Sequence, residues 1–414
     1  MVEPLFENDA VVLGILMGVL SFVFITSNSR HPFWKRFYKY FPALLLCYFI
    51  PSILNSCGII SGERSNLYFV ASRYLLPASL VLLTISVDLP AIRRLGPKAL
   101  IMFLTGTIGV IIGGPIAILL ISVISPDLMG FQGPEAVWRG FSTVAGSWIG
   151  GGANQAAMKE IFGVGDSIFS AMIAIDVIVA NIWMALLLYG TGIDDKINKW
   201  FNADVSSIDD LKRKMEKYKE QIMCIPETSD TMKVLAIGFG ITGIAHLGSD
   251  IIAPAIDKVA PGLARFSLTS GFFWLIVLST TIAIILSFTN LRNIEGIGAS
   301  RIGSIFIYIL VATIGMKMNI LAIFDNPSLF FIGLIWMAIH AILLIVVAKI
   351  IKAPFFFMAV GSKANVGGAA SAPILASAFH PSLAPVGVLL AVMGYAIGTY
   401  GAWLCGILMQ AVSP

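Results

Sequence analysis

The residue of this chain with the clearest chemical potential is a carboxylate inside an apolar segment. Asp176 lies near the middle of IFSAMIAIDVIVANIWMALLLY, residues 168–189, where the cost of burying a charge makes an ionisable residue a candidate functional group by default. We favour a role as a Na⁺ ligand or proton carrier over the alternative, a structural hydrogen bond to a neighbouring helix. Asn181 follows five residues later, about 140° further around a helix of 3.6 residues per turn, so it need not share a face with Asp176. It is equally suited to helix packing and to binding a ligand.

Three consecutive glycines mark a second candidate region, GSWIGGGANQAAM at 146–158. A glycine inside a helix costs about 1 kcal/mol relative to alanine, and within a bilayer an unwound backbone is tolerated only where it is buried in protein or lines a wet cavity. The sequence therefore predicts a helix that is interrupted around Gly151 and Gly152. The freed backbone and the side-chain carbonyls of Asn154 and Gln155 would offer oxygen ligands to a cation. Alternatively, these side chains cap the ends of the two half-helices.

The same pattern returns near the C-terminus as GSKANVGGAASAP at 361–373, which predicts a second interrupted helix. Asn365 and Ser371 could complete an oxygen shell or cap the freed helix ends, and both roles can coexist. Lys363 is the only charge well inside its apolar segment. We prefer a role in compensating the converging ends of the broken helices over a role as counter-charge for an anionic substrate.

These side chains predict a sodium site and not an enzyme active site. Asp176, Asn154 and Gln155 are the candidate Na⁺ ligands, because hard cations are bound by several oxygens. No other cofactor is expected. The four cysteines lack CxxC or metal-ligand spacing and the four histidines lack an HExxH arrangement, so the sequence indicates neither a zinc site, nor a disulfide framework, nor an intramembrane metalloenzyme.

The composition defines the environment in which these groups work. Hydrophobic residues make up 57% and charged residues 12% of the 414, and the mean hydropathy is +0.90; soluble domains have about 45–50% apolar and about 25% charged residues. We therefore expect an all-α, multi-pass protein of the cell membrane that contacts the lipid bilayer. The net charge of +4 comes mostly from short loops and is explained by the positive-inside rule, so no nucleic-acid partner is expected.

Apolar stretches long enough to cross about 30 Å of hydrocarbon give twelve candidate spans. They lie at 10–27, 41–60, 68–87, 99–124, 137–162, 167–190, 231–252, 266–288, 300–319, 328–350, 353–379 and 383–411. The loops 28–40 and 88–98 are both basic, which places them in the cytoplasm and the N-terminus outside.

The polar region 191–230 divides the chain into a first membrane repeat (1–190), a linker with a short surface helix at 209–221, and a second membrane repeat (231–414). Two repeats with one discontinuous helix each are typical of secondary transporters, whose sites lie where half-helix ends meet near the midplane. The alternative is that the small residues only let helices pack closely, which leaves the polar residues beside the glycines unexplained. Six spans per repeat would make the two repeats parallel. If all basic loops lie in the cytoplasm, however, the number of crossings between 98 and 191 must be even, and three candidate spans lie there. We therefore favour inverted repeats, with one segment miscounted.

At these paired motifs, with SVDLPAIRRLG (86–96) ahead of the first, the chain resembles over essentially its whole length the YjcL-like family of uncharacterised integral membrane proteins. That family is distantly similar to the superfamily of cation/proton antiporters and bile-acid/sodium symporters. The resemblance implies a panel domain, a core domain in which two broken helices cross, and alternating access by an elevator-like or rocking movement. It also makes a homodimer plausible. In the antiporter branch the span after the first crossing helix carries the ion-binding carboxylates, whereas the matching span here has Asp176 alone, which counts against two-acid chemistry.

These observations together predict a cation-coupled secondary active transporter, with Na⁺ or H⁺ as the coupling ion and a small organic, anionic solute as the cargo. One alternative is a Na⁺/H⁺ antiporter, which the missing second acid disfavours. Another is a channel or a structural membrane partner. A channel or a structural membrane partner would not need a buried carboxylate beside two broken helices.

Overall fold

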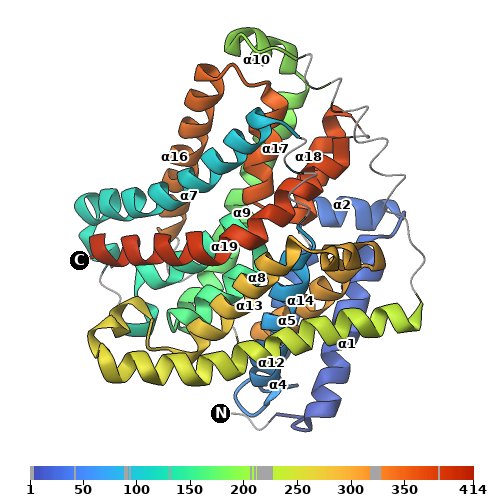
Figure 1. Cartoon of the computed structure of the whole chain (residues 1–414), viewed down its shortest axis with the longest axis vertical. Helices are drawn as coiled ribbons and strands as arrows, with labels where there is room; N and C mark the ends of the chain where they lie inside the picture. The colour runs from blue at the N-terminus through green and yellow to red at the C-terminus, as the bar shows by residue number, and fades with distance from the viewer. Residues whose placement is uncertain are drawn as a thin grey trace.

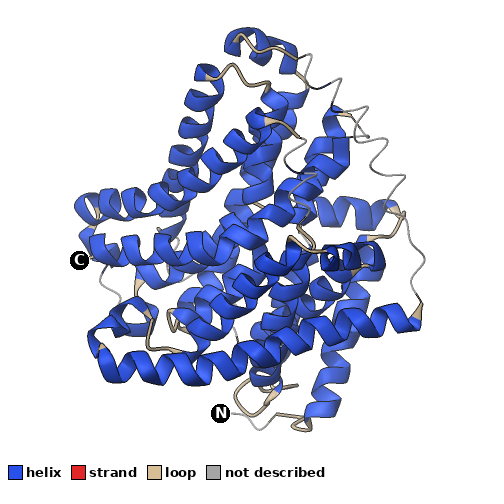
Figure 2. Cartoon of the chain, viewed as in Figure 1, coloured by secondary structure: helices blue, strands red, loops and turns tan. Residues whose placement is uncertain are grey.

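The computed structural model describes residues 4–41, 43–87, 95–129, 132–205, 227–317, 328–380 and 383–414, together with positions 92, 208 and 211. Within these residues every regular element is a helix (Figure 2), which confirms the all-α class. The predicted surface helix at 209–221 lies outside the described residues apart from position 211, and so does most of the basic loop 88–98.

Local sequence signals account for where helices begin. Asn8 precedes α1 (Asp9–Ser27), and its side chain accepts a hydrogen bond from the Ala10 amide at 2.9 Å, which satisfies one of the amides that a helix start leaves free. Proline occupies the first position of α7 (Pro97–Ile124), where its missing N–H group costs no helical hydrogen bond.

The helices pack into two groups. The first, which we call the panel helices, is held together by contacts of α5 with α12, α13 and α14, and of α3 with α1 and α14. Its members are α1, α3 (Ala43–Ser56), the continuous run α4 (Leu67–Val70), η1 (Ala71–Leu75) and α5 (Leu76–Ile85), and then α12 (Thr228–Val259), α13 (Gly271–Ser287) and α14 (Ala299–Gly315). A separate apolar cluster joins α5, α12, α13 and α14.

The second group, the core helices, is organised around α19. The contact of α19 with α8 is the most extensive between any two helices described, and α7 packs against α16, α17 and α19. The members are α7, α8 (Val137–Ile161), α9 (Asp166–Thr191), α16 (Leu329–Ile350), α17 (Phe355–Asn365), α18 (Gly368–Phe379) and α19 (Ala384–Val412). Figure 1 shows α7, α16, α17 and α18 in the upper part of the molecule and α1, α5 and α12 in the lower part.

The two groups alternate along the chain. Panel helices come first, core helices follow, and the same order is repeated after the break between α9 and α12. Short helices connect them: α2 (Pro32–Tyr40), α10 (Asp194–Phe201), and the 3-10 helices η2 (Pro126–Met129), η3 (Gly133–Glu135), η4 (Pro261–Phe266) and η5 (Asn290–Ile297). This order is the one that two repeats would produce, while the repeats and their orientation stay predictions.

Each of the twelve predicted stretches contains a helix among the described residues, but fewer of them qualify as single membrane spans. Among the described residues seven helices are long and apolar enough, or nine if each of two bent pairs, α2 with α3 and α13 with η5, counts as one span. The difference has a physical reason. α17 and α18 are each too short alone, α8 is interrupted and partly polar, and the 17 residues of α14 rise only about 26 Å.

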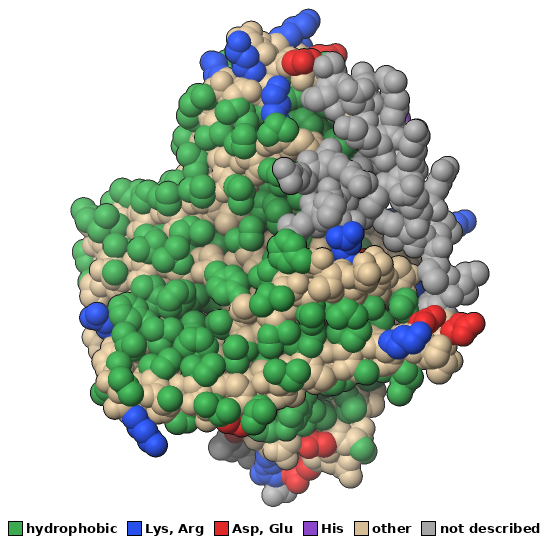
Figure 3. All heavy atoms as spheres, in the orientation of Figure 1, with side chains coloured by type: hydrophobic (Ala, Val, Ile, Leu, Met, Phe, Trp, Pro, Cys, Tyr) green, Lys and Arg blue, Asp and Glu red, His purple; other side chains and the backbone are tan. Residues whose placement is uncertain are grey.

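The outer surface suits a bilayer. Large apolar side chains are exposed along α7, including Ile108, Ile112 and Leu119, and along α12, including Ile244 and Leu247. Figure 3 shows hydrophobic side chains over much of one face of the molecule, with Lys, Arg, Asp and Glu mainly near its margins. A soluble monomer rarely exposes an apolar area of this kind, so the protein is a multi-pass membrane protein.

Candidate functional site

The first glycine motif breaks α8 at one residue. Gly151 has φ +73° and ψ −172°, a conformation that only glycine adopts at little cost. The bend is sharp: a Cβ atom on Gly146 would lie 2.5 Å from the carbonyl oxygen of Asn154, whereas eight residues of straight helix would separate them by about 12 Å. The segments 137–150 and 152–161 are therefore two half-helices, and the predicted interruption is present.

The second motif separates α17 from α18. Val366 has non-helical φ and ψ angles of −82° and 89°, and Gly367 and Gly368 follow with φ of +115° and +56°. Gly367 caps α18 through its left-handed backbone and offers no side chain to the free amides of the first turn. The described residues thus contain two helices broken at glycine, both among the core helices.

Two asparagines repair the two breaks in the same manner. Asn154 donates from Nδ2 to the Gly150 carbonyl at 3.0 Å, and Asn365 donates from Nδ2 to the Gly361 carbonyl at 3.0 Å. Each carbonyl lies four residues earlier in the chain. The Gly150 carbonyl ends the first half of α8, so Asn154 caps that half-helix, whereas Gly361 lies inside α17 and Asn365 reinforces the last turn of that helix.

Each asparagine also accepts a hydrogen bond from a threonine on a long helix. Thr399 of α19 donates to Oδ1 of Asn154 at 2.7 Å, and Thr107 of α7 donates to Oδ1 of Asn365 at 2.8 Å. The glycine before each threonine, Gly398 or Gly106, permits the contact, because a Cβ there would approach the asparagine Nδ2 to 2.6 Å or 2.9 Å.

Asp176 on α9 is buried against the bend of α8. Its side chain is 6% exposed and accepts hydrogen bonds from Ser147 Oγ at 2.6 Å, Trp148 Nε1 at 2.8 Å and Gln155 Nε2 at 3.2 Å. The first two donors precede Gly151 and the third follows it. The carboxylate therefore ties the two halves of α8 together, and three donors satisfy its charge.

Lys363 supplies a second buried charge near Asp176. Its side chain is 2% exposed and donates from Nζ to the carbonyl oxygen of Ala180 at 3.0 Å, one turn after Asp176 on α9. The ammonium and the carboxylate are not within the 4.0 Å of a salt bridge, yet each acts electrostatically on the other. Two opposite charges in a poorly polarisable interior attract beyond contact distance.

One cavity meets both breaks. It has a volume of about 110 Å³, and its core-side wall consists of Gly151–Ala153, Gly367–Ala369 and Tyr395. The opposite wall comes from the panel helices, with Leu44, Leu83, Ser304, Ile307 and Tyr308. The cavity therefore lies on the boundary between the two groups of helices.

The predicted site residues divide into separate surroundings. Asp176, Gln155 and Lys363 lie near one another; Gly151 and Gly152 line the cavity; and Asn154 and Asn365 bind threonines on opposite long helices. Ser371 has a buried Oγ without a hydrogen-bond partner among the described residues. Asn181 is exposed and donates to the Val177 carbonyl of its own helix at 2.8 Å.

Sequence reasoning missed three participants. Trp148 is hidden in the glycine motif as an apparent apolar residue, and only its indole N–H reveals its role. Thr107 and Thr399 had a detectable signal, because each lies in a Gly-Thr-x-Gly sequence, at 106–109 and at 398–401. Repetition of that short pattern on two helices indicates that each packs against the same kind of partner, here an asparagine at a helix break.

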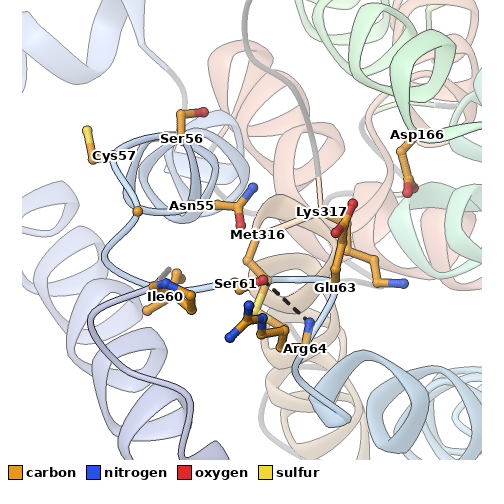
Figure 4. Close-up of a pocket in the computed structure, with 12 residues that line it drawn as sticks. Asn55, Ser56, Cys57, Ile60, Ser61, Glu63, Arg64, Asp166, Met316 and Lys317 are labelled. Atoms are coloured by element: carbon orange, nitrogen blue, oxygen red, sulfur yellow. Dashed lines mark hydrogen bonds between the residues drawn. The ribbon is translucent and has the colours of Figure 1, made fainter. Parts of the chain in front are cut away.

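A second, larger cavity lies at the end of the molecule near the N-terminus. We call it the vestibule; it has a volume of about 420 Å³ and is lined by Pro4, Asn55–Gly58, Ile60, Ser61, Glu63, Arg64, Asp166, Met316 and Lys317. Figure 4 shows Asp166 and Lys317 on one side of it and Asn55 and Cys57 on the other. Apart from Asp166 of α9, the lining comes from panel helices and the segments next to them.

Comparisons with known proteins agree that this is a membrane protein. The chain is 24% identical over 380 residues to the uncharacterized membrane protein YjcL of Bacillus subtilis (strain 168), in an alignment that covers 86% of this chain and 88% of that protein. Residues 14–412 match a family model described as protein of unknown function (DUF819). Since that match spans nearly the whole chain, the resemblance inferred from the paired motifs is confirmed, and the protein belongs to the DUF819 family.

Proposed function

We propose that this protein is a cation-coupled secondary active transporter of a small organic, anionic solute, and that it works by alternating access. The observation that supports this most is the cavity shared by the two helix breaks, at the boundary between panel and core helices. Discontinuous helices whose ends meet at such a place form the binding sites of secondary transporters.

The solute's charge follows from the helix ends at the cavity. The half-helix 152–161 and α18 both begin there, and the cap of α18 contributes no side-chain hydrogen bond. The free amides at a helix N-terminus and the positive end of the helix dipole favour an anionic group. A carboxylate or similar group on the solute would be held by backbone amides at this position.

The coupling ion would act through Asp176. A proton or Na⁺ on this carboxylate competes with the hydrogen bonds from Ser147, Trp148 and Gln155. Because these donors lie on both sides of Gly151, a change in the state of the carboxylate alters the connection between the halves of α8. The shape of the cavity wall at Gly151–Ala153 would change with it.

Thermal stability of the purified protein tests ion binding at Asp176. Na⁺ is titrated against K⁺ at constant ionic strength, for the wild type and for Asp176→Asn. A ligand that binds only the folded state raises stability by about 2.7 kcal/mol at 100 times its Kd. We expect Na⁺-specific stabilisation of the wild type that Asp176→Asn removes and that Asp166→Asn, on the same helix, preserves.

Three other results would redirect the proposal. If Na⁺ and K⁺ act alike at every pH but acidification stabilises only the wild type, H⁺ is the coupling ion. If proteoliposomes exchange Na⁺ for H⁺ without any solute, the protein is a Na⁺/H⁺ antiporter. If Asp176→Asn changes none of the ion responses, Asp176 has a structural role and cation coupling at this residue is wrong.

A further inference from the structure

Glu160, at the end of the second half of α8, binds two residues of the panel helices. Its carboxylate accepts a hydrogen bond from the hydroxyl of Tyr68 on α4, and Arg73 Nη1 lies 2.9 Å from its Oε2. The other ion pairs of the described residues stay on one side: Arg64 with Glu7 and Lys233 with Asp230 at the panel helices, and Lys159 with Asp166 in the core. Among the described residues, the contact of Arg73 with Glu160 is thus the one ion pair that joins core to panel.

Arg73 is held firmly on the panel side. It lies in η1, a π-helical turn inserted between α4 and α5, and such turns are frequent at functional sites. Its backbone carbonyl is hydrogen-bonded at 2.9 Å to Nε2 of His246 on α12. Its guanidinium lies over the ring of Phe272 on α13, 4.3 Å from the centroid, a favourable cation–π geometry. Arg73 therefore cannot follow a movement of the core helices while these contacts remain.

Tyr68 is fixed from both groups. The ammonium of Lys317, just after α14, lies 4.6 Å from the centre of its ring, and the ammonium of Lys159 lies 5.2 Å from it. Lys159 also pairs with Asp166 at 2.8 Å. Since Lys317 and Asp166 line the vestibule (Figure 4), the contacts of Glu160 lie beside this cavity.

We infer that Glu160, Tyr68 and Arg73 form a latch on the vestibule side of the cavity that meets both helix breaks, which we call the inner cavity, and that this latch closes it there. The inference rests on the proposed function, because a latch between core and panel has a role only if the two groups move relative to each other. Opening requires that Glu160 leave both partners at once. Glu160 shares the half-helix 152–161 with Gln155, a ligand of Asp176, so the state of Asp176 is transmitted to the latch through one short rigid element.

Accessibility of the inner cavity tests the latch without any knowledge of the solute. Ala153 lines the cavity and is 1% exposed. A cysteine is placed there in a background without the four native cysteines, because Cys57 lines the vestibule. A small, membrane-impermeant methanethiosulfonate is added to intact cells and to inside-out vesicles, and the labelling rate is measured from each face.

The variants separate the latch from general stability. Glu160→Ala removes the latch carboxylate. Asp230→Asn is the matched control, because it removes a carboxylate that pairs with Lys233 at 2.9 Å, the same distance, but within the panel helices and away from the latch and the vestibule. Arg73→Glu combined with Glu160→Arg restores an ion pair with reversed charges. Thermal stability and gel filtration confirm that each variant is folded.

Hydrogen bonds to charged groups stabilise the closed latch strongly. Without them, Glu160→Ala should populate the open state more and raise the labelling rate from the vestibule face by roughly tenfold to a hundredfold. The Asp230→Asn rate should equal that of the starting protein, and the charge-reversed pair should return toward it. Unchanged labelling in folded Glu160→Ala, an equal increase in Asp230→Asn, or a charge-reversed pair that labels as fast as Glu160→Ala would each refute the latch. The labelling rates are compared without Na⁺ or solute, so the latch can fail while Na⁺-specific stabilisation persists, and Na⁺-specific stabilisation can fail while the latch is confirmed.

Discussion

Ser147 and Gln155 donate hydrogen bonds to the same atom, Oδ2 of Asp176, from opposite sides of the bend at Gly151. A single carboxylate on α9 thus holds a helix in its broken form. In a membrane, where water does not reach freed backbone and side-chain groups, this contact makes the bend a defined structure and links its geometry to the state of one ionisable group.

The indole of Trp148 should contribute more than packing. Trp148 donates to the Asp176 carboxylate, whereas the adjacent Trp336, with ring centroids 4.8 Å apart, donates to the neutral carbonyl of Val110 at 2.9 Å. Both side chains are fully buried, so Trp148→Phe and Trp336→Phe lose similar volume. Hydrogen bonds to charged groups contribute about 1.5–3 kcal/mol and neutral ones about 1 kcal/mol. Trp148→Phe should therefore be more destabilising by about 1 kcal/mol in reversible unfolding, and Asp176→Asn should remove that difference.

Alanine should be tolerated at one glycine of the first motif and not at its neighbour. Gly151 has a positive φ, and Gly151→Ala should cost about 1–3 kcal/mol of backbone strain or partly straighten α8. Gly152 lacks a positive φ. A Cβ atom added there would have Cγ2 of Ile307, at 3.8 Å, as its nearest neighbour, so Gly152→Ala should be neutral or slightly stabilising. Unfolding free energies measure both effects. Equal costs for the two variants would contradict the assignment of the break to Gly151.

Asn154 and Asn365 make equivalent hydrogen bonds, so removing the threonine donor of either one should lower stability by a similar amount. Thr107→Val and Thr399→Val preserve volume but leave Oδ1 of Asn365 or Asn154 without its donor. Each should lower stability by about 1–3 kcal/mol, the cost of a buried polar atom left unsatisfied. Thr105→Val on α7, whose hydroxyl bonds only the Ile101 carbonyl in its own helix, is the control and should cost much less. A large effect at one of the two threonines alone would show that the breaks are not equivalent.

The helical segments and both breaks were predictable from the sequence because they depend on local chemistry. Apolar length predicts a helix in lipid, and Gly150–Gly152 and Gly367–Gly368 cannot continue one cheaply. The burial of Asp176 was predictable for the same reason. The pairing of side chains was not, because it depends on contacts between helices far apart in the chain. Asn154 was expected beside Asp176, one residue from Gln155, yet the bend directs it to Thr399.

The latch was beyond sequence reasoning for a related reason. Glu160 and Arg73 each lie near the end of an apolar segment, where a charge normally faces solvent or lipid head groups. Nothing in either segment indicates that the two residues meet across 87 positions. The packing of α8 against the panel helices brings them together.

The two buried charges should depend on each other although they do not touch. Lys363 is 2% exposed and bonds only the Ala180 carbonyl among the described residues. Lys363→Met fills a similar volume but leaves the Asp176 carboxylate without its nearby positive charge, and removing one member of a buried pair costs about 3–5 kcal/mol when the pair is in contact; we expect a smaller cost here. Asp176→Asn combined with Lys363→Met should be less destabilising than the sum of the single variants, by about 0.5–3 kcal/mol. Reversible unfolding of all four proteins gives this coupling. Strict additivity would mean that Lys363 does not compensate Asp176, which would leave the helix ends or an anionic solute as the partner of its charge.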